Sequence, residues 1–325
     1  MQQEFEYIRE IFRAGSFTKA AENLHVTQPA LSMAVKKIES SIGMSLFDRK
    51  AKPIELTESG RVYMDAIQKI AAAEWEMNAK IHDMQSLATG KICIGGSHYI
   101  NAYILPEAMT EYSKLYPGIK IELVEESSAV LAVMLRERLI DLTLTCRDDI
   151  IAEFEHYPTF DDHILLAVSP DVMNLDCAMS AHDVIEGKHL NDNQPCIPFE
   201  AMNELEYIIL SEGNNLHDRA KNIFASAGIE PKIKLEISQL ATSYYLARAK
   251  FGAAFVSDRM IATNESRLVF YRVDSPVAGR VFYAVLPKRE YIPKAVRAFI
   301  EVLRGSQKLP SHSGIYTTQK NFNRV

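Results

Sequence analysis

The stretch from Gly15 to Glu39 constrains the fold more than any other, because it has the pattern of two short helices joined by a tight turn. Ser16 is placed to cap the first helix, since a serine hydroxyl accepts a hydrogen bond from the free amides of a first turn. The turn falls at residues 25–26. Thr27 is placed to cap the second helix, and Pro29 lies in its first turn, where the missing N–H costs nothing. The sequence therefore predicts a helical hairpin.

The second helix of this hairpin has two chemically different faces. Leu31, Val35 and Ile38 recur at helical spacing on one side, and polar or basic residues occupy the other. A short polar helix supported by a small apolar hairpin suits the major groove of DNA. Alternatively, this is one of the many helical hairpins that bind no nucleic acid.

This stretch and its continuation resemble the LysR-type transcriptional regulators over a long run without gaps. The resemblance implies an all-α winged helix-turn-helix domain at the N-terminus, a linker helix, and an α/β effector domain. That effector domain would have two lobes and the fold of type II periplasmic binding proteins. The matching residues are Gly15-Ser16-Phe17, Ala20-Ala21, Leu24, Val26 to Ser32, Ile38-Glu39, Gly43, Leu46 to Arg49 and Leu56 to Gly60.

The resemblance also implies a function. We expect a regulator that binds promoter dyad sites in double-stranded DNA as a homo-oligomer, dimer or tetramer, and that responds to a small-molecule effector. RNA polymerase is a further partner that the family allows. The sequence does not identify the effector or the promoter, and it leaves activation and repression equally open.

DNA binding must come from a local basic patch, because the formal net charge of the whole chain is −6. Between Thr27 and Lys52, five basic residues stand against two acidic ones, a local charge of +3. Residues 48–56 are turn-rich and look like the wing of a winged helix, whose cations would contact the DNA backbone or a minor groove. The DNA contacts that we expect are Ser16, Thr27, Gln28, Pro29, Ser32, Lys36, Arg49, Lys50 and Lys52.

Two further helices accompany the hairpin. Within residues 1–14, Phe5, Ile8, Ile11 and Phe12 recur at helical spacing, and we expect all of them in the core. After Thr57, the sequence predicts a long helix from 58 to about 88, with apolar residues in the steps of three and four of a heptad seam that only Glu74 interrupts. The seam residues are Tyr63, Ile67, Ile70, Met77, Ile81, Met84 and Ala88.

This long helix suggests dimerisation. About 30 residues of helix would be roughly 45 Å long, and a rod of that length cannot bury its apolar stripe alone. Pairing with the same helix of a second chain is the simplest solution, and the family resemblance implies it too. Alternatively, the helix packs along its own C-terminal domain.

From residue 90 onward, short apolar runs alternate with helical segments, which predicts a parallel sheet with helices on both faces. We expect strands at 91–95, 119–124, 141–145, 163–168, 207–210, 232–236, 252–256, 267–271 and 280–286, the last two returning to the first lobe. Helices are expected at 101–116, 128–138, 214–227, 239–250 and 292–304, and the path of residues 171–203 stays open.

These segments divide the chain. Residues 1–58 form the DNA-binding domain, 59–89 the linker and dimerisation helix, 90–306 the effector-binding domain and 307–325 a tail. Within the effector-binding domain, lobe I comprises 90–167 and 268–306, and lobe II comprises 168–267. Two positions depart from the family pattern, with Lys250 where glycine is usual and Ser257 where proline is common.

An effector site is expected outside the carboxyl ends of the strands, where ligands of open α/β sheets bind. Hydroxyls and helix N-terminal amides suit a small anion such as a carboxylate or a phosphate. Ser97 and Ser128 are the best candidates, although both could simply cap helices, and His98 either contacts the ligand or is only solvated. The expected contacts are Ser97, His98, Ser127, Ser128, Gly213, Asn214 and Gln239.

Other classes of function lack support in the sequence. It contains no recognisable nucleophile–base pair, spaced carboxylate pair, metal cluster or phosphate loop, so we expect no enzyme, no cofactor and no metal. A transport-type binding protein would need an export signal, which the N-terminus lacks, and no run is apolar enough to span a bilayer. We therefore expect a soluble, cytoplasmic protein.

The cysteines give little further guidance. They show neither a CxxC pair nor metal-like spacing, so free thiols are expected. Alternatively, the two in lobe II form a redox switch, although their spacing does not match that of the family's peroxide sensors. The four cysteines are Cys93, Cys146, Cys177 and Cys196.

Overall fold

The computed structural model describes residues 2–84, 90–288 and 291–307. The chain divides into two compact units, Met1–Ile81 and His82–Val325. Each unit has its own hydrophobic core. Among the described helices, none combines the length and the hydropathy that a bilayer crossing requires.

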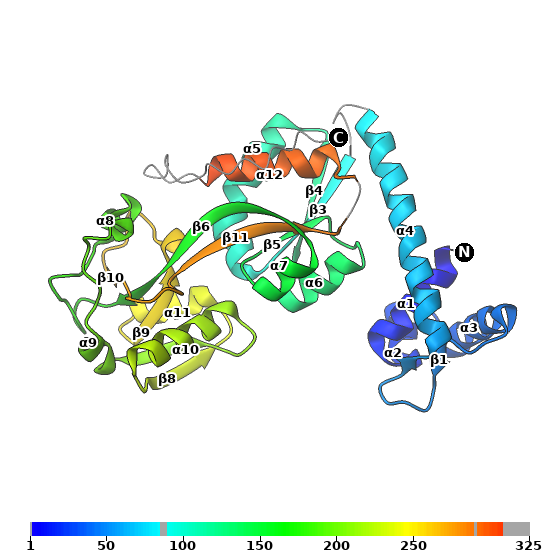
Figure 1. The fold of residues 1–325 in the computed structure, drawn as a ribbon, viewed down its shortest axis with the longest axis horizontal. Coiled ribbons are helices and arrows are strands. Elements are labelled where there is room, and N and C mark those ends of the chain that lie inside the picture. The colour runs from blue at the N-terminus through cyan, green and yellow to red at the C-terminus, as the bar shows by residue number, and fades with distance from the viewer. Residues whose placement is uncertain (1, 85–89, 289–290, 308–325) are drawn as a thin grey trace. The chain divides into compact units, whose positions relative to one another are not determined.

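The N-terminal unit is the predicted winged helical hairpin, drawn from blue to cyan in Figure 1. The amide of Lys19 donates to the Ser16 hydroxyl at 3.5 Å, and the amide of Ala30 donates to the Thr27 hydroxyl at 3.4 Å, so both predicted caps are confirmed. The elements are α1 (Gln2–Ala14), α2 (Phe17–Asn23), α3 (Gln28–Ile42), the antiparallel strands β1 (Phe47–Asp48) and β2 (Glu55–Leu56), and α4 (Glu58–Met84).

The core of this unit contains most of the predicted apolar residues but not all of them. Ile8, Ile11 and Leu31 are fully buried. The expectation for Phe12 is wrong, because 46% of its surface is exposed. Consecutive residues of a helix point in different directions, so burying Ile11 turns Phe12 away from the hairpin. The last residues of the predicted long helix, 85–88, lie outside the described residues.

The C-terminal unit is built on one curled sheet of nine strands in the order β4-β3-β5-β11-β6-β9-β7-β8, with β10 paired to β6. The strands are β3 (Gly90–Gly96), β4 (Ile119–Glu125), β5 (Leu142–Thr145), β6 (Glu155–Val168), β7 (Glu206–Leu210), β8 (Lys232–Ile237), β9 (Ala253–Ser257), β10 (Val269–Tyr271) and β11 (Gly279–Leu286).

The prediction of a parallel sheet is wrong for the middle of this sheet. The pairs β3–β4, β3–β5, β7–β8 and β7–β9 are parallel, whereas β6, β10 and β11 pair antiparallel with their neighbours. Figure 1 shows why, since β6 and β11 run side by side in opposite directions between the two ends of this unit. Strand β6 runs from one end of this unit toward the other, and β11 runs in the opposite direction.

Strand β6 begins eight residues earlier than predicted, at Glu155 instead of His163. Its first part, Glu155–His163, pairs with β11, and its last part pairs with β9 and β10. The exchange of partners therefore falls inside the strand, between His163 and Ile164. Strand β10, expected to return to the first lobe, instead pairs with the same end of β6 as β9 does.

Helices cover the sheet, and α5 packs against α12. The segment with the open path, 171–203, contains only short helical turns and is tied to the strand region by bridges from Met179 to Phe270 and from Cys196 to Arg272. The helical elements are η1 (Ile100–Ile104, a π-helical turn), α5 (Leu105–Leu115), α6 (Ser128–Arg136), α7 (Asp148–Glu153), α8 (Ala181–Ile185), η2 (Lys188–Leu190), α9 (Phe199–Asn203), α10 (Asn215–Ala227), α11 (Leu240–Arg248), η3 (Asp258–Met260) and α12 (Lys294–Ser306).

Candidate nucleic-acid interface and effector pocket

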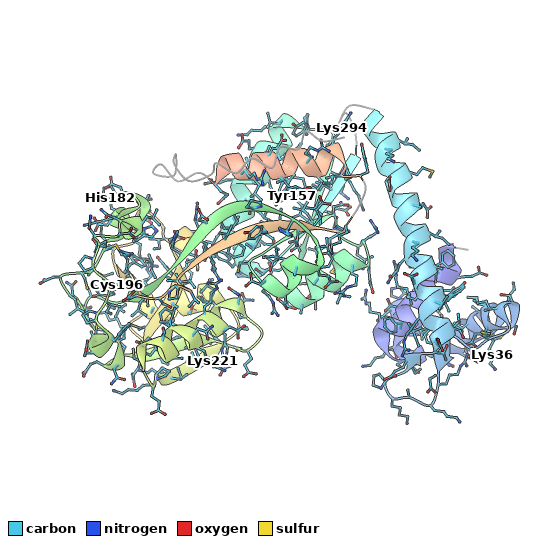
Figure 2. All side chains as sticks on the ribbon, in the orientation of Figure 1. Lys36, Tyr157, His182, Cys196, Lys221 and Lys294 are labelled. Carbon is cyan, nitrogen blue, oxygen red and sulfur yellow. The ribbon has the colours of Figure 1, made fainter. Side chains whose placement is uncertain are left out.

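The outer face of α3 presents polar side chains to solvent. Gln28, Pro29 and Lys36 are exposed and Ser32 is half-buried, whereas the apolar stripe of the same helix lies in the core. Figure 2 labels Lys36 on this helix. Helix α3 therefore has the two faces that the sequence predicted.

Ser16 and Thr27 have structural roles that limit what else they can contact. Each hydroxyl accepts from a backbone amide of the helix that it caps. Both residues lie at the N-terminal end of a helix, where backbone N–H groups and the helix dipole favour a negatively charged group such as a phosphate.

The connection between β1 and β2 carries Lys50 and Lys52 exposed to solvent. Arg49 differs from them, because its Nη2 lies 3.0 Å from Glu39 Oε2 on α3 and its Nη1 donates to Ser32 Oγ at 3.5 Å. The guanidinium also lies 4.9 Å from the centre of the Phe17 ring. Arg49 thus links the wing to α3, and part of its charge is already neutralised.

The apolar seam of α4 changes character along the helix. Ile67 is buried and Tyr63 half-buried in the core of the N-terminal unit, so these two residues serve that core. Farther along, Ile70, Met77 and Ile81 are 47%, 54% and 50% exposed. The Met84 side chain and Ala88 lie outside the described residues. Within the N-terminal unit, this later part of the seam is an exposed apolar stripe.

A pocket of about 430 Å³ opens in the C-terminal unit beyond the carboxyl ends of β3, β5, β7 and β8. Helices α6, α10 and α11 begin at its rim, so their free amide groups lie nearby. Its polar lining consists mainly of hydroxyl and amide side chains. The lining residues are Ser97, Tyr99, Ser127, Ser128, Ala129, Leu144, Thr145, Cys146, Arg147, Ser211, Glu212, Gly213, Asn214, Asn215, Leu216, Ser238, Leu240, Arg280 and Phe282.

Five of the seven predicted effector contacts line this pocket, namely Ser97, Ser127, Ser128, Gly213 and Asn214. His98 and Gln239 do not belong to the lining. The His98 Nδ1 instead lies 3.3 Å from Glu125 Oε1, and Gln239 precedes α11 without capping it. The cap of α6 is Ser127, whose hydroxyl accepts from the Val130 amide at 3.4 Å, so the alternative that Ser128 only caps a helix is wrong.

The wall of the pocket contains a buried ion pair that the sequence did not reveal. Arg280 donates to Asp162 Oδ1 at 2.6 Å, and the two side chains are 4% and 0% exposed. The second carboxylate oxygen of Asp162 accepts from Tyr99 and from Ser257, the latter at 2.6 Å. Burial lowers the pKa of Arg280, but the Asp162 charge outweighs it and raises the pKa above its usual value.

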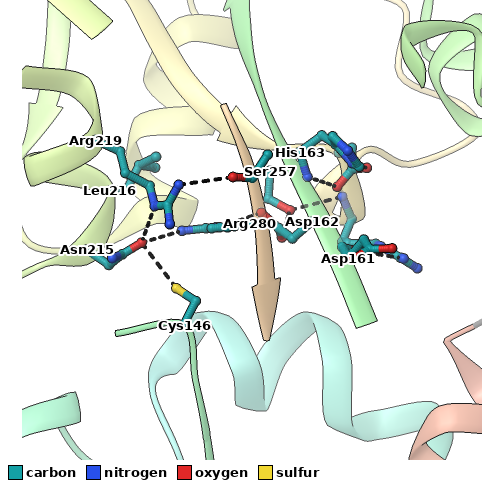
Figure 3. Close-up of polar contacts among 12 residues, drawn as sticks. Cys146, Asp161, Asp162, His163, Asn215, Leu216, Arg219, Ser257 and Arg280 are labelled. Atoms are coloured by element: carbon teal, nitrogen blue, oxygen red, sulfur yellow. Dashed lines mark hydrogen bonds and ion pairs between the residues drawn. The ribbon is translucent and has the colours of Figure 1, made fainter. Parts of the chain in front are cut away.

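Asn215 connects this ion pair to the rest of the wall, as Figure 3 shows. Its side-chain oxygen accepts from Arg280 at 3.2 Å, from Arg219 at 2.9 Å and from the Cys146 thiol at 3.1 Å. Burial raises the pKa of Cys146, so this thiol stays protonated at neutral pH. All four cysteines are free, and the two in lobe II also have raised pKa values because of burial.

These wall residues lacked a sequence signal of their own. Arg280 and Asp162 would both be assigned to a solvated surface by type alone. Asn215 follows the predicted Asn214 and Tyr99 follows the predicted His98, so proximity to predicted residues was the hint that the sequence offered.

Two family models match this chain, one in each of its two units. The model for the bacterial regulatory helix-turn-helix protein of the lysR family matches residues 2–61, and the model for the LysR substrate binding domain matches residues 85–308. The chain belongs to the LysR family. Members of this family are DNA-binding transcriptional regulators and not enzymes, and the same holds for this chain.

Relatives of this LysR-family chain align with it along nearly its whole length. The HTH-type transcriptional regulator YcgK of Bacillus subtilis (strain 168) is 26% identical, with 93% of this chain and 94% of that protein covered. A probable RuBisCO transcriptional regulator of Trichormus variabilis is 24% identical, with 91% and 85% covered.

Solved structures show the same fold. Full-length OxyR from Pseudomonas aeruginosa has a TM-score of 0.63 at 22% identity, covering 96% of this chain and 95% of that one. Full-length CbnR in complex with its target DNA has a TM-score of 0.57 at 18% identity, covering 94% and 99%. The curled mixed sheet of the C-terminal unit agrees with the expected periplasmic-binding-protein-like fold.

Proposed function

We propose that this LysR-family regulator binds promoter dyad sites as a homo-oligomer, with the exposed face of one α3 per half-site in the major groove. The two faces of α3 carry the proposal, because its apolar stripe is buried while Gln28, Ser32 and Lys36 lie on the opposite, outward face. Gln28 and Ser32 have side chains that can read base edges, and Lys36 contacts phosphate. The wing adds Lys50 and Lys52 beside the duplex.

The uncovered stripe of α4 supports homo-oligomerisation. Ile70, Met77 and Ile81 each expose about half of their surface along one helix. The same stripe on a second chain would cover them, and a symmetric pair would place two α3 helices on a dyad. The residues proposed for the linker, 59–89, include this stripe.

The pocket supports a small anionic effector. Helix N-termini and hydroxyls at its rim donate hydrogen bonds, and the lining includes Arg147 and Arg280. Binding there would act on DNA affinity only through a difference in effector affinity between two arrangements of the oligomer. The proposed site of action is the cytoplasm, where promoter DNA lies, and contact with RNA polymerase stays a hypothesis.

DNA recognition is tested with the protein's own upstream region. We expect salt-sensitive binding in fluorescence anisotropy. We also expect Gln28→Ala to narrow the gap in affinity between that region and random DNA by roughly 100-fold, because one base contact worth about 10-fold is lost in each of two half-sites. Gln68→Ala, an exposed glutamine of α4, is the control. If Gln28→Ala kept both affinity and preference, the base-reading role of α3 would be wrong.

The effector site is tested by thermal-shift screening of small carboxylates and phosphates on the full-length protein. A ligand at 100 times its Kd should stabilise the native state by about 2.7 kcal/mol. Ser128→Ala should shift the dose–response curve to higher concentration, while Ser266→Ala, an exposed serine outside the pocket lining, should not. An unchanged curve for Ser128→Ala would remove this serine from the site.

A further inference from the structure

A second cavity, of about 240 Å³, lies in the C-terminal unit and is lined by His189 and Asp258. These two residues meet His163, so that two imidazoles and one carboxylate come together. The three residues come from separate segments. His163 lies in β6, His189 in the turn η2 of the 171–203 segment, and Asp258 at the start of η3.

The donor atoms of this cluster converge on one carboxylate oxygen. His189 Nε2 lies 3.0 Å from Asp258 Oδ2, and His163 Nδ1 lies 3.4 Å from the same oxygen. One ligand atom from each residue falls within 4.8 Å of the others. The side chains of His189 and Asp258 are 1% and 2% exposed and that of His163 is 31% exposed, so two ligands are interior and the third lies at the edge of the cluster.

Hydrogen bonding alone leaves this cluster incomplete. The His163 amide donates to Asp258 Oδ1 at 3.1 Å, which fixes the carboxylate and leaves Oδ2 toward the imidazoles. The buried Nδ1 of His163 points at Oδ2 but makes no hydrogen bond with acceptable geometry. The neighbouring Arg259 does not bind this carboxylate, because its guanidinium donates to the carbonyls of Asp161 and Gln307.

We propose that His163, His189 and Asp258 bind one divalent transition-metal ion of the zinc type. Ligands of a tetrahedral zinc ion lie about 2.0–2.2 Å from the metal and therefore roughly 3.3 Å from one another, close to the two donor separations found here. Imidazole nitrogens favour such ions over magnesium or calcium, which prefer all-oxygen sites. The ion would also give the buried His163 Nδ1 a binding partner.

The ion would join three parts of the C-terminal unit. It would hold the 171–203 segment, through His189, to the strand β6 and to the chain that follows β9. Three protein ligands leave a fourth position of a tetrahedral ion open. Since His189 and Asp258 line the second cavity, a water molecule from that cavity would fill this position.

The first test measures metal binding by the full-length protein after removal of metals with EDTA. Titration with Zn²⁺ should give one ion per chain, and at 100 times the Kd it should raise the melting temperature by roughly 5–10 °C, whereas Mg²⁺ should not. With Co²⁺, the absorption spectrum should show nitrogen and oxygen ligation. Absence of Zn²⁺ binding, or a thiolate-to-cobalt band that reveals cysteine ligands, would overturn the proposal.

The second test compares variants. His163→Gln and Asp258→Asn should each weaken Zn²⁺ binding by roughly 10-fold or more, and the thermal shift should fall with it. His182→Gln is the matched control, because His182 lies in the same region but is exposed and outside the cluster. Unchanged binding in His163→Gln, or a loss in His182→Gln alone, would place the metal elsewhere. Should one of these two variants fail to fold, the other still decides.

Discussion

The salt dependence of DNA binding separates two cations that the sequence alone treats as equivalent. Lys36 is exposed, whereas Arg49 is held by Glu39 at 3.0 Å. Each phosphate contact contributes about 0.9 to the slope of log K against log salt. Because a dimer carries two copies, Lys36→Ala should flatten the slope by about 1.8. Between 50 and 200 mM salt, Lys36→Ala should therefore lose about 12-fold less DNA affinity than the unchanged protein.

Arg49→Ala should flatten the slope by less than about 0.9, because Glu39 already neutralises part of the Arg49 charge. Anisotropy titrations at four or more salt concentrations measure both slopes. Glu39→Gln is the control, since it removes the charge while an amide oxygen can still accept from the Leu46 amide, and it should steepen the slope. Equal flattening by Arg49→Ala and Lys36→Ala would refute the view that the ion pair with Glu39 persists on DNA.

Three further outcomes follow from the same structure. Lys250→Gly should be more stable than Lys250→Ala by about 0.5–1 kcal/mol, because position 250 has a φ of 68° that strains any residue with a Cβ, and calorimetry checks the difference. Met77→Lys should dissociate the oligomer in sedimentation experiments, because it places a charge on the uncovered stripe of α4. Asp162→Asn should lower the free energy of unfolding by about 3 kcal/mol, because it leaves Arg280 buried without its charged partner. The double variant Asp162→Asn with Arg280→Met should recover this stability in urea unfolding.

Local rules predicted the helical hairpin of the N-terminal unit, whereas its winged helix-turn-helix fold was expected from the family resemblance. Its caps and its left-handed helix end at Gly43 are set by residues within a few positions of one another. Periodicity also identified the buried stripe of α3. Phe12 escaped the prediction because spacing alone does not say which of two adjacent apolar residues faces the hairpin. The heptad spacing of α4 predicts an apolar stripe, and Ile70, Met77 and Ile81 are each about half exposed, but spacing alone does not say which surface covers this stripe.

The C-terminal unit shows where local rules stop. The start of β6 carries charged residues, including Asp161 and Asp162, and therefore looks like a loop in the sequence. The strand forms because β11 pairs with it from more than 100 residues away along the chain. The same distance hides the Asp162–Arg280 pair, which no spacing rule can reveal. Five of the seven residues expected at the effector site line one pocket, because strand ends in an α/β sheet gather at one edge whatever the partner strands are.

Lys250 and Ser257, the two departures from the family pattern, have different physical consequences. Lys250 follows α11 in the left-handed conformation, and the amides of Lys250 and Phe251 donate to Ala247 and Leu246 in the hydrogen-bond pattern of a helix end that favours glycine. The departure therefore strains the backbone.

Ser257 has the opposite effect, since its hydroxyl donates to Asp162 at 2.6 Å and lies 2.8 Å from the Tyr99 hydroxyl. A proline there could form neither contact. An ionised carboxylate that is fully buried requires all of its hydrogen bonds, and Asp162 in turn holds Arg280 at the wall of the pocket. Ser257 does not line the pocket itself, but through Asp162 it helps to fix the position of Arg280 in the pocket wall.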